Sequence, residues 1–245
     1  MAVKGMILAA GYGTRLAALT RYCPKALLPV SGIPMIHFAV EKLKRAGCRE
    51  LIVNAHHFAD QIIEYFQQTD AGVPVHVLRE PDILGTGGAV LHAAPLLKDE
   101  DVFLLYNADI VTDADLQALL LPHTGSAGSR KLLATLLVNR RETRRALLFD
   151  SRMQFLGKEV WLNDAQSLAG DVRRLGFCGV HAISGELFRL GLTEGFSDIF
   201  DLYRYGMDRG CTLHGVLSEA YWTDLGTPDR IAAHESYMRQ HNRTV

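Results

Sequence analysis

Residues 6–36 read MILAAGYGTRLAALTRYCPKALLPVSGIPMI, and this stretch decides the fold of the chain. A short apolar run ends at Ala10, a loop with Gly11 and Gly13 follows, and Lys25 comes later beside a second apolar run. We interpret this order as a strand, a phosphate loop, a helix and then a cation. Glycines let the backbone approach an anion closely, and amides at a helix start bind it. The stretch therefore predicts a polyphosphate site.

The loop matches neither of two common phosphate-binding motifs. No GK[ST] sequence ends the turn, and GYGTRL lacks the third glycine of a dinucleotide fingerprint. The full string LAAGYGTRL, followed by PKALLPV and GIPMI, resembles the amino-terminal signature of the nucleotidyltransferases that activate sugar 1-phosphates. This resemblance implies an enzyme that joins a nucleoside triphosphate to a sugar 1-phosphate and releases pyrophosphate.

Composition limits the class of partner. The 245 residues fit one large domain or two small ones, and we expect one. Lys and Arg total 26 against 27 Asp and Glu, so no global field attracts nucleic acid or an anionic membrane. The start is too short for a signal peptide, and no apolar run approaches a membrane span of about 18 residues. We expect a cytoplasmic protein, either a monomer or a homodimer.

The cysteine and histidine patterns favour neither a zinc site nor covalent catalysis. The four cysteines are far apart and form no CxxC pair, so neither a zinc site nor a redox motif is favoured and we expect reduced thiols. They are Cys23, Cys48, Cys178 and Cys211. His56 and His57 are adjacent at a strand end and point to opposite faces, so they cannot easily ligate one metal. No Ser/His/Asp arrangement supports covalent catalysis.

Apolar strands alternate with amphipathic helices in the first half. The predicted helices are 35–46, 59–67 and one after Gly88, and the predicted strands are 51–55, 74–78 and one from Val102. This order predicts an α/β protein, a three-layer α/β/α sandwich with a mostly parallel mixed central sheet. The resemblance implies the Rossmann-like nucleotide-diphospho-sugar transferase fold. Ligands of such sheets bind beyond the carboxyl ends of the strands, where the loops 11–15, 80–88 and 107–110 lie.

The pattern changes near residue 130 without a linker. Strands are predicted at 132–138, 146–150 and 177–183, and a helix at 196–210. We expect a single domain over 1–245, with a nucleotide-binding half at about 1–125 and a sugar phosphate-binding half at about 126–245. No hexapeptide repeats follow, so we expect the nucleotidyl step alone.

Charge is the main obstacle in the implied reaction. A sugar phosphate is already an ionised nucleophile near neutral pH, so its attack on the α-phosphorus needs no strong base. Two anions must instead be brought together and the charge on pyrophosphate stabilised. This requires a divalent metal with Arg and Lys as clamps.

Two acidic residues are the expected metal ligands. Asp109, in YNADIVTDAD, follows a buried strand and resembles the [GA]D position of the family. Asp224, in WTDLGTPDRI, resembles the W-x-D-x-G-x-P element, whose acidic residue shares the metal. A helix cap at Asp109 and a plain turn at Asp224 are the alternatives. Carboxylate oxygen suits a hard cation, so we expect Mg²⁺.

The resemblance also implies a nucleotide site. Arg15 is expected on the β- and γ-phosphates and Lys25 near the reacting centre, as the catalytic cations. LREPDILGTGGAV, residues 78–90, resembles the LGTGxA loop beside the base and ribose. Glu80 replaces a common Gln and could accept from uracil N3–H or the cytosine amino group. With LAAG in place of LAGG, this favours UTP. The full set is Leu8, Ala9, Ala10, Gly11, Gly13, Thr14, Arg15, Lys25, Glu80, Gly85, Thr86, Gly87 and Gly88.

The sugar phosphate side departs from the family pattern. The usual E-K-P segment is missing, and LGKEV offers Lys158 instead. The charge run Arg140, Arg141, Arg144 and Arg145 is either solvated or a phosphate contact. His181, inside an apolar strand, is either a core histidine or a pocket residue. The expected sugar phosphate set is Asn107, Lys158, Gly179, His181 and Arg145, with Asn163 as a further pocket residue.

Several functions remain open within the resemblance. Short chains with LAAG and a GTGG-type loop are most similar to N-acetylmuramate 1-phosphate uridylyltransferases. Mannose or heptose 1-phosphate guanylyl transfer and cytidylyl transfer to phosphocholine are alternatives. A catalytically silent paralogue that binds a nucleotide sugar and regulates a partner is an alternative of another class.

Overall fold

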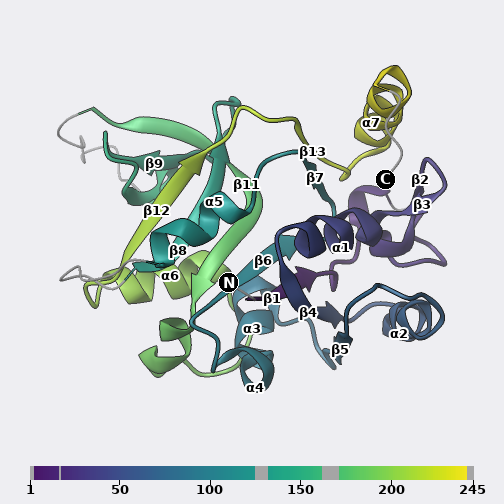
Figure 1. Cartoon of the computed structure of the whole chain (residues 1–245), viewed down its shortest axis with the longest axis horizontal. Helices are drawn as coiled ribbons and strands as arrows, with labels where there is room; N and C mark the ends of the chain where they lie inside the picture. Colours follow the sequence, from purple (N-terminus) through teal and green to yellow (C-terminus); the bar gives the residue numbers. More distant parts are fainter. Residues whose placement is uncertain (1–2, 17, 125–131, 162–170, 242–245) are drawn as a thin grey trace.

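The computed structural model describes residues 3–16, 18–124, 132–161 and 171–241. Its centre is a nine-stranded mixed sheet with the path β10-β9-β11-β6-β1-β4-β5, while β8 pairs with β11 and with β12 (Figure 1). These strands are β1 (Val3–Leu8), β4 (Cys48–Ala55), β5 (Val75–Arg79), β6 (Val102–Asn107), β8 (Leu132–Asn139), β9 (Leu147–Phe149), β10 (Phe155–Lys158), β11 (Arg173–Ser184) and β12 (Thr212–Leu217). The pairs β1–β4, β1–β6, β4–β5 and β8–β12 are parallel, and β11 runs antiparallel to its neighbours.

Helices cover both faces of this sheet. They are α1 (Met35–Arg45), α2 (Ala59–Gln68), α3 (Gly85–His92), α4 (Ala94–Leu97), α5 (Gln117–Leu120), α6 (Ile199–Met207) and α7 (Pro228–Gln240). Side chains alternate between the faces of a strand. Ile7 accordingly packs in the core under α1 and α2, whereas its neighbour Met6 packs in the core under α3 and α6. The predicted three-layer arrangement is therefore confirmed.

The prediction of a helix after the first loop is wrong. Between Gly13 and Pro24 the described residues, which leave out residue 17, contain the 3₁₀ turn Thr14–Leu16 in place of an α-helix. Gly13 adopts a left-handed conformation with φ of +66°, which interrupts a helical path, and Pro24 restricts the residue before it. Conversely, α3 starts at Gly85 rather than after Gly88, so the glycine loop forms the first turn of that helix.

Strand β11 joins the two halves of the chain. It pairs with β6 of the first half and with β8 and β9 of the second. Its register against β8 shifts between Phe177 and His181, and Gly179 lies in this irregular segment with φ of +77°. Such a bulge bends the strand locally.

A small second sheet returns the end of the chain to the same edge. Strand β13 (Trp222–Asp224) pairs antiparallel with β7 (Ile110–Thr112), and α7 follows it. In Figure 1, α7 lies near the hairpin of β2 (Pro29–Val30) and β3 (Ile33–Pro34). The amide of Ser31 donates to Glu235 of α7 at 2.9 Å. In the described part of the chain, no helix is long and apolar enough to cross a membrane.

Candidate active site

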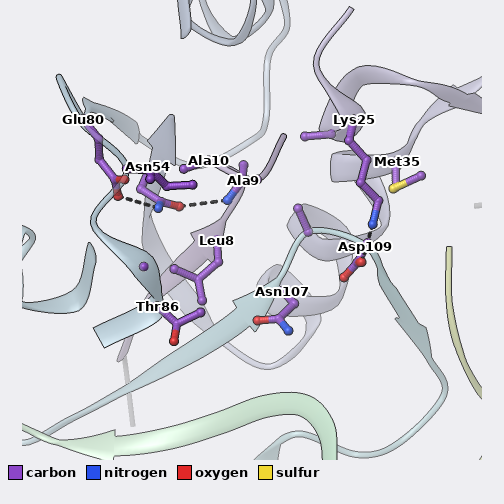
Figure 2. Close-up of a pocket in the computed structure, with 15 residues that line it drawn as sticks. Leu8, Ala9, Ala10, Lys25, Met35, Asn54, Glu80, Thr86, Asn107 and Asp109 are labelled. Carbon is purple, nitrogen blue, oxygen red and sulfur yellow. Dashed lines mark hydrogen bonds and ion pairs between the residues drawn. The ribbon is translucent and has the colours of Figure 1, made fainter. Parts of the chain in front are cut away.

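A cavity of about 230 Å³ opens at the carboxyl ends of β1, β4 and β6. Figure 2 shows its two sides, with a hydrogen-bonded network on one and an ion pair on the other. Many of the residues predicted for the nucleotide line it. They are Leu8, Ala9, Ala10, Gly11, Lys25, Glu80, Gly85 and Thr86, together with Asn107 and Asp109 from β6 and the turn after it.

Glu80 is the centre of the network on one side. Its side chain is 2% exposed, and its two oxygens accept from the Asn54 amide at 2.7 Å and from the Leu84 backbone amide at 3.1 Å. Asn54 in turn accepts from the Ala9 amide at 2.8 Å. Sequence reasoning missed Asn54, although a polar residue near the end of a buried strand was the available signal. The network ties the glycine loop to β4 and to the end of β1.

Lys25 and Asp109 form the ion pair on the other side (Figure 2). Lys25 begins the 3₁₀ helix Lys25–Leu27, and Asp109 lies in the turn between β6 and β7. Their side chains are 16% and 22% exposed. The pair is therefore accessible from the cavity while being shielded from bulk solvent.

Asp224 lies beside this turn because β13 pairs with β7. Asp224 is the register partner of Ile110, and the amide of Leu225 donates to the carbonyl of Asp109 at 2.8 Å. The Asp224 carboxylate accepts from the Gly226 amide at 3.2 Å and forms an ion pair with Arg230 in the first turn of α7. Arg230 was missed, although it stands in the quoted element WTDLGTPDRI.

Arg15 approaches the same glycine as Asp224. A Cβ added to Gly226 would lie 2.7 Å from Nη2 of Arg15 and 2.7 Å from Oδ1 of Asp224. A side chain at this position would displace one of the two groups. The structure thus gathers Asp224, Arg15 and Arg230 around one turn, next to the segment that carries Asp109.

Trp222 anchors β13 to the main sheet. Its Nε1 donates to the Cys178 carbonyl at 2.8 Å, and the Arg141 guanidinium lies 4.0 Å from its ring centre. Arg141 also donates to Asn139 at 2.9 Å and to the Phe177 carbonyl. The Arg141 guanidinium thus makes its hydrogen bonds and its ring contact within the protein. This residue of the charge run supports the fold.

A second cavity of about 500 Å³ adjoins the first and shares Leu8, Thr86 and Asn107 with it. Asn107, Lys158, His181 and Arg145, all predicted for the sugar phosphate, line this sugar cavity. Gly179 lies behind the wall, because a Cβ there would be 3.0 Å from the Asn107 amide nitrogen. Asn163 lies outside the described residues.

His181 is both buried and part of the cavity wall. Its Nδ1 is 2.8 Å from the Tyr203 hydroxyl, and burial lowers the pKa of His181 to about 3. The ring is therefore neutral near pH 7 and can only exchange hydrogen bonds. Burial raises the pKa of the nearby Cys178 thiol to about 11, so this thiol stays protonated.

The other predicted glycines position the backbone. A Cβ on Gly87 would lie 2.8 Å from the Asp198 carbonyl oxygen, and one on Gly88 would strike the Gly195 carbonyl. Both glycines let α3 pack closely against the segment before α6. Gly13 and Thr14 belong to the loop that turns Arg15 toward Asp224, and neither lines the first cavity.

The two carboxylates at 109 and 224 form a small donor set. Within the described ranges, no group of three or more His, Cys, Asp or Glu could hold a metal. Mg²⁺ is commonly bound by one or two carboxylates, with waters and substrate phosphates as the remaining ligands. Two carboxylates on paired segments, Asp109 and Asp224, fit that pattern at the predicted phosphate site.

Comparisons with known proteins agree with the family that the sequence resembles. Residues 4–146 match the nucleotidyl transferase family model. An N-acetylmuramate alpha-1-phosphate uridylyltransferase from Caulobacter vibrioides is 30% identical over 249 residues, with 96% of each chain covered. A mannose-1-phosphate guanyltransferase from Pichia angusta is 34% identical over 137 residues, covering 54% of this chain and 37% of that relative. The chain thus spans little more than a third of the guanyltransferase.

The fold has solved counterparts as well. An inositol-1-phosphate CTP transferase from T. maritima aligns with a TM-score of 0.77 at 16% identity, covering 100% of this chain and 98% of that one. The relatives that the chain matches are enzymes that transfer nucleotidyl groups. The chain belongs to the nucleotidyl transferase family. The predicted family, fold and enzyme class are confirmed.

Proposed function

We propose that the protein catalyses Mg²⁺-dependent transfer of a uridylyl group from UTP to a sugar 1-phosphate, with N-acetylmuramate 1-phosphate as the first candidate. The observation that carries this proposal is the pairing of β7 with β13, which joins the Asp109 and Asp224 segments beside Lys25 and Arg15. Two carboxylates and two cations at a phosphate loop suit a reaction between anions.

The chain's own residues would align and neutralise the reactants. Lys25, which lines the first cavity, would contact the α-phosphate, and Arg15 would hold the outer phosphates that leave as pyrophosphate. A guanidinium binds two phosphate oxygens at once, whereas an ammonium acts as a point charge. Asn107 lines both cavities and would contact the attacking phosphate. No residue needs to remove a proton, since the attacking oxygen is already ionised.

Asp109 and Asp224 would hold the Mg²⁺. When bound, this ion supplies positive charge to the reacting phosphates. In the structure both carboxylates are paired with cations, Asp109 with Lys25 and Asp224 with Arg230. Metal binding would release these two cations, and they would then be available to the phosphates.

The base pocket supports a pyrimidine through Glu80. Each of its oxygens already accepts one internal hydrogen bond, and each retains a second lone pair. One of these would accept from uracil N3–H. The relative from Caulobacter vibrioides, which matches along 96% of both chains, supports the same base and sugar.

A matrix of substrates tests the proposal. Pyrophosphate release is measured with Mg²⁺, each of the four nucleoside triphosphates and a panel of sugar 1-phosphates that includes N-acetylmuramate, mannose and heptose derivatives, with phosphocholine added. We expect the highest kcat/KM with UTP and N-acetylmuramate 1-phosphate. A preference for GTP or CTP would overturn the uridylyl assignment. Tight nucleotide sugar binding without release from any pair would identify a silent paralogue.

A further inference from the structure

Three cavities adjoin one another along the sheet edge. The sugar cavity meets the first cavity at Leu8, Thr86 and Asn107. At its other side it shares Arg141 and Thr143 with a third cavity of about 600 Å³ over the loop between β8 and β9. The first and third cavities have no lining residue in common among those described. The sugar cavity therefore has an inner end near Thr86 and an outer end near Thr143.

Lys158 belongs to the inner end. Its Nζ is 3.3 Å from Oδ1 of Asp198 and 4.4 Å from the centre of the Phe200 ring. The residue after Asp198, Ile199, donates its amide to the Thr86 hydroxyl at 2.9 Å. Because Thr86 lines both cavities, Lys158 is close to where the two reacting phosphates must meet. Under the proposed function, the 1-phosphate of the sugar would bind at this end, near Lys158.

Arg145 belongs to the outer end. Its backbone amide donates to the Thr143 hydroxyl at 3.2 Å, and its side chain is exposed. Among the described residues this side chain has no hydrogen bond and no ion pair, whereas the other two cations of the wall are occupied. Arg141 is bonded to Asn139, and Lys158 is paired with Asp198. A cation without a counter-charge thus lines the sugar cavity next to Thr143, where the third cavity begins.

Lys158 is the register partner of Leu147, which follows Arg145 by two residues, so the two cations lie on the same wall of the cavity with uncharged side chains beside them. His181 is neutral because of its burial, and Leu147 and Phe177 are apolar. Lys158 is already paired with Asp198, so an anion bound at Arg145 would be a second group, next to the one at Lys158. A substrate that satisfies both cations carries a second anionic group in addition to its phosphate.

We propose that the outer end recognises a carboxylate on the sugar and that Arg145 is the specificity-determining residue. This inference rests on the proposed function and narrows its substrate class to acidic sugar 1-phosphates. A guanidinium pairs with a carboxylate through two parallel hydrogen bonds, which gives geometric selectivity as well as attraction. The carboxylate can come from an ether-linked lactyl group, as in N-acetylmuramate, or from C6, as in a uronate.

Matched substrate pairs test this assignment. We compare kcat/KM for N-acetylmuramate against N-acetylglucosamine 1-phosphate, and for glucuronate against glucose 1-phosphate, with UTP. The expected wild-type ratio favours one acidic sugar by about tenfold or more. In Arg145→Ala the ratio falls to within about threefold of one, chiefly through a higher KM for the acidic sugar, and Arg145→Lys retains part of the preference. Arg152→Ala, an exposed arginine in the turn between β9 and β10, leaves the ratio unchanged.

The outcomes distinguish the role of Arg145 from the nucleotidyl transfer itself. The role of Arg145 is overturned if the wild-type enzyme uses neutral and acidic sugars equally well, or if the ratio is unchanged in Arg145→Ala. Either result leaves the nucleotidyl transfer in place. No pyrophosphate from either pair with any nucleotide overturns both. The pair that shows the preference identifies whether the carboxylate is ether-linked or at C6.

Discussion

The backbone amide of Leu225 donates a hydrogen bond to the carbonyl of Asp109, with 2.8 Å between nitrogen and oxygen. This bond continues the ladder between β7 and β13, in which Asp224 is the partner of Ile110. Residues opposite one another in an antiparallel ladder are about 4.5–5.5 Å apart at Cα. The two acidic segments are therefore fixed relative to each other by backbone geometry.

Removing either acidic charge should abolish turnover without unfolding the protein. Asp109→Asn and Asp224→Asn keep the size of the side chain and lose the charge that would hold Mg²⁺. We expect loss of pyrophosphate release and weaker Mn²⁺ binding by titration calorimetry. Asp115→Asn, an exposed site with a local hydrogen bond to Gln117, is the control. Normal metal affinity in either active-site variant would remove that residue from the metal site.

Lys25→Ala should lower the rate at saturating substrates. The loss of one electrostatic donor costs at least about 2 kcal/mol of transition-state stabilisation, or about 30-fold in kcat. Lys98→Ala removes an exposed lysine elsewhere and should leave the rate unchanged. A wild-type kcat for Lys25→Ala would show that Lys25 only pairs with Asp109.

Arg230→Gln should tighten metal binding in the absence of nucleotide. Arg230 occupies the Asp224 carboxylate, so a divalent cation competes with it for the same oxygens. We expect a severalfold lower Kd for Mn²⁺ in titration calorimetry. Arg239→Gln changes an arginine of the same helix that contacts Ser236 instead, and it should bind Mn²⁺ like the wild type. Equal or weaker affinity in Arg230→Gln would contradict the competition.

Gly85→Ala should destabilise the protein more than Gly32→Ala. The φ angles of Gly85 and Gly32 are +70° and +80°. A residue with a Cβ loses about 1–2 kcal/mol of stability in this left-handed conformation. Only at Gly85 would the new Cβ also lie 2.5 Å from the Ser197 carbonyl oxygen. Overpacking adds about 1–3 kcal/mol. Urea unfolding measures the difference, and similar losses for both variants would show that the segment before α6 moves freely aside.

Stability should fall in acid partly because of His181. Its pKa is about 3 in the folded protein and about 6.5 when exposed, so the unfolded chain takes up the proton first. The free energy of unfolding therefore falls as pH drops from about 6.5 toward 3, by about 1.4 kcal/mol per pH unit from this group. His181→Gln should reduce the dependence of the unfolding free energy on pH between pH 6 and pH 4 by about 1.4 kcal/mol per pH unit. Urea titrations at a series of pH values measure this dependence. His123, whose pKa is lowered to about 4, contributes equally to both proteins. Parallel slopes would contradict the assignment.

Local sequence determined the strands, most helices and the edge where the site lies. Short continuous apolar runs mark β1, β4 and β6, and a ligand loop follows each in a parallel sheet. The resemblance of the loop and of WTDLGTP identified the family and suggested both acidic residues. Local patterns failed at the first loop, because Gly13 and Pro24 override the helical tendency between them.

Tertiary structure alone decided which polar residues act together. The pairing of β13 with β7, the hydrogen bond between Glu80 and Asn54 and the ion pair of Lys25 with Asp109 join distant segments. Arg141 and Arg145 belong to one charge run and line the same cavity, but only the Arg141 guanidinium also contacts Trp222 and Asn139. The sequence shows identical side chains at these two positions. Their surroundings differ because the register and bend of β11 are set by packing across the whole sheet, which local propensity does not encode.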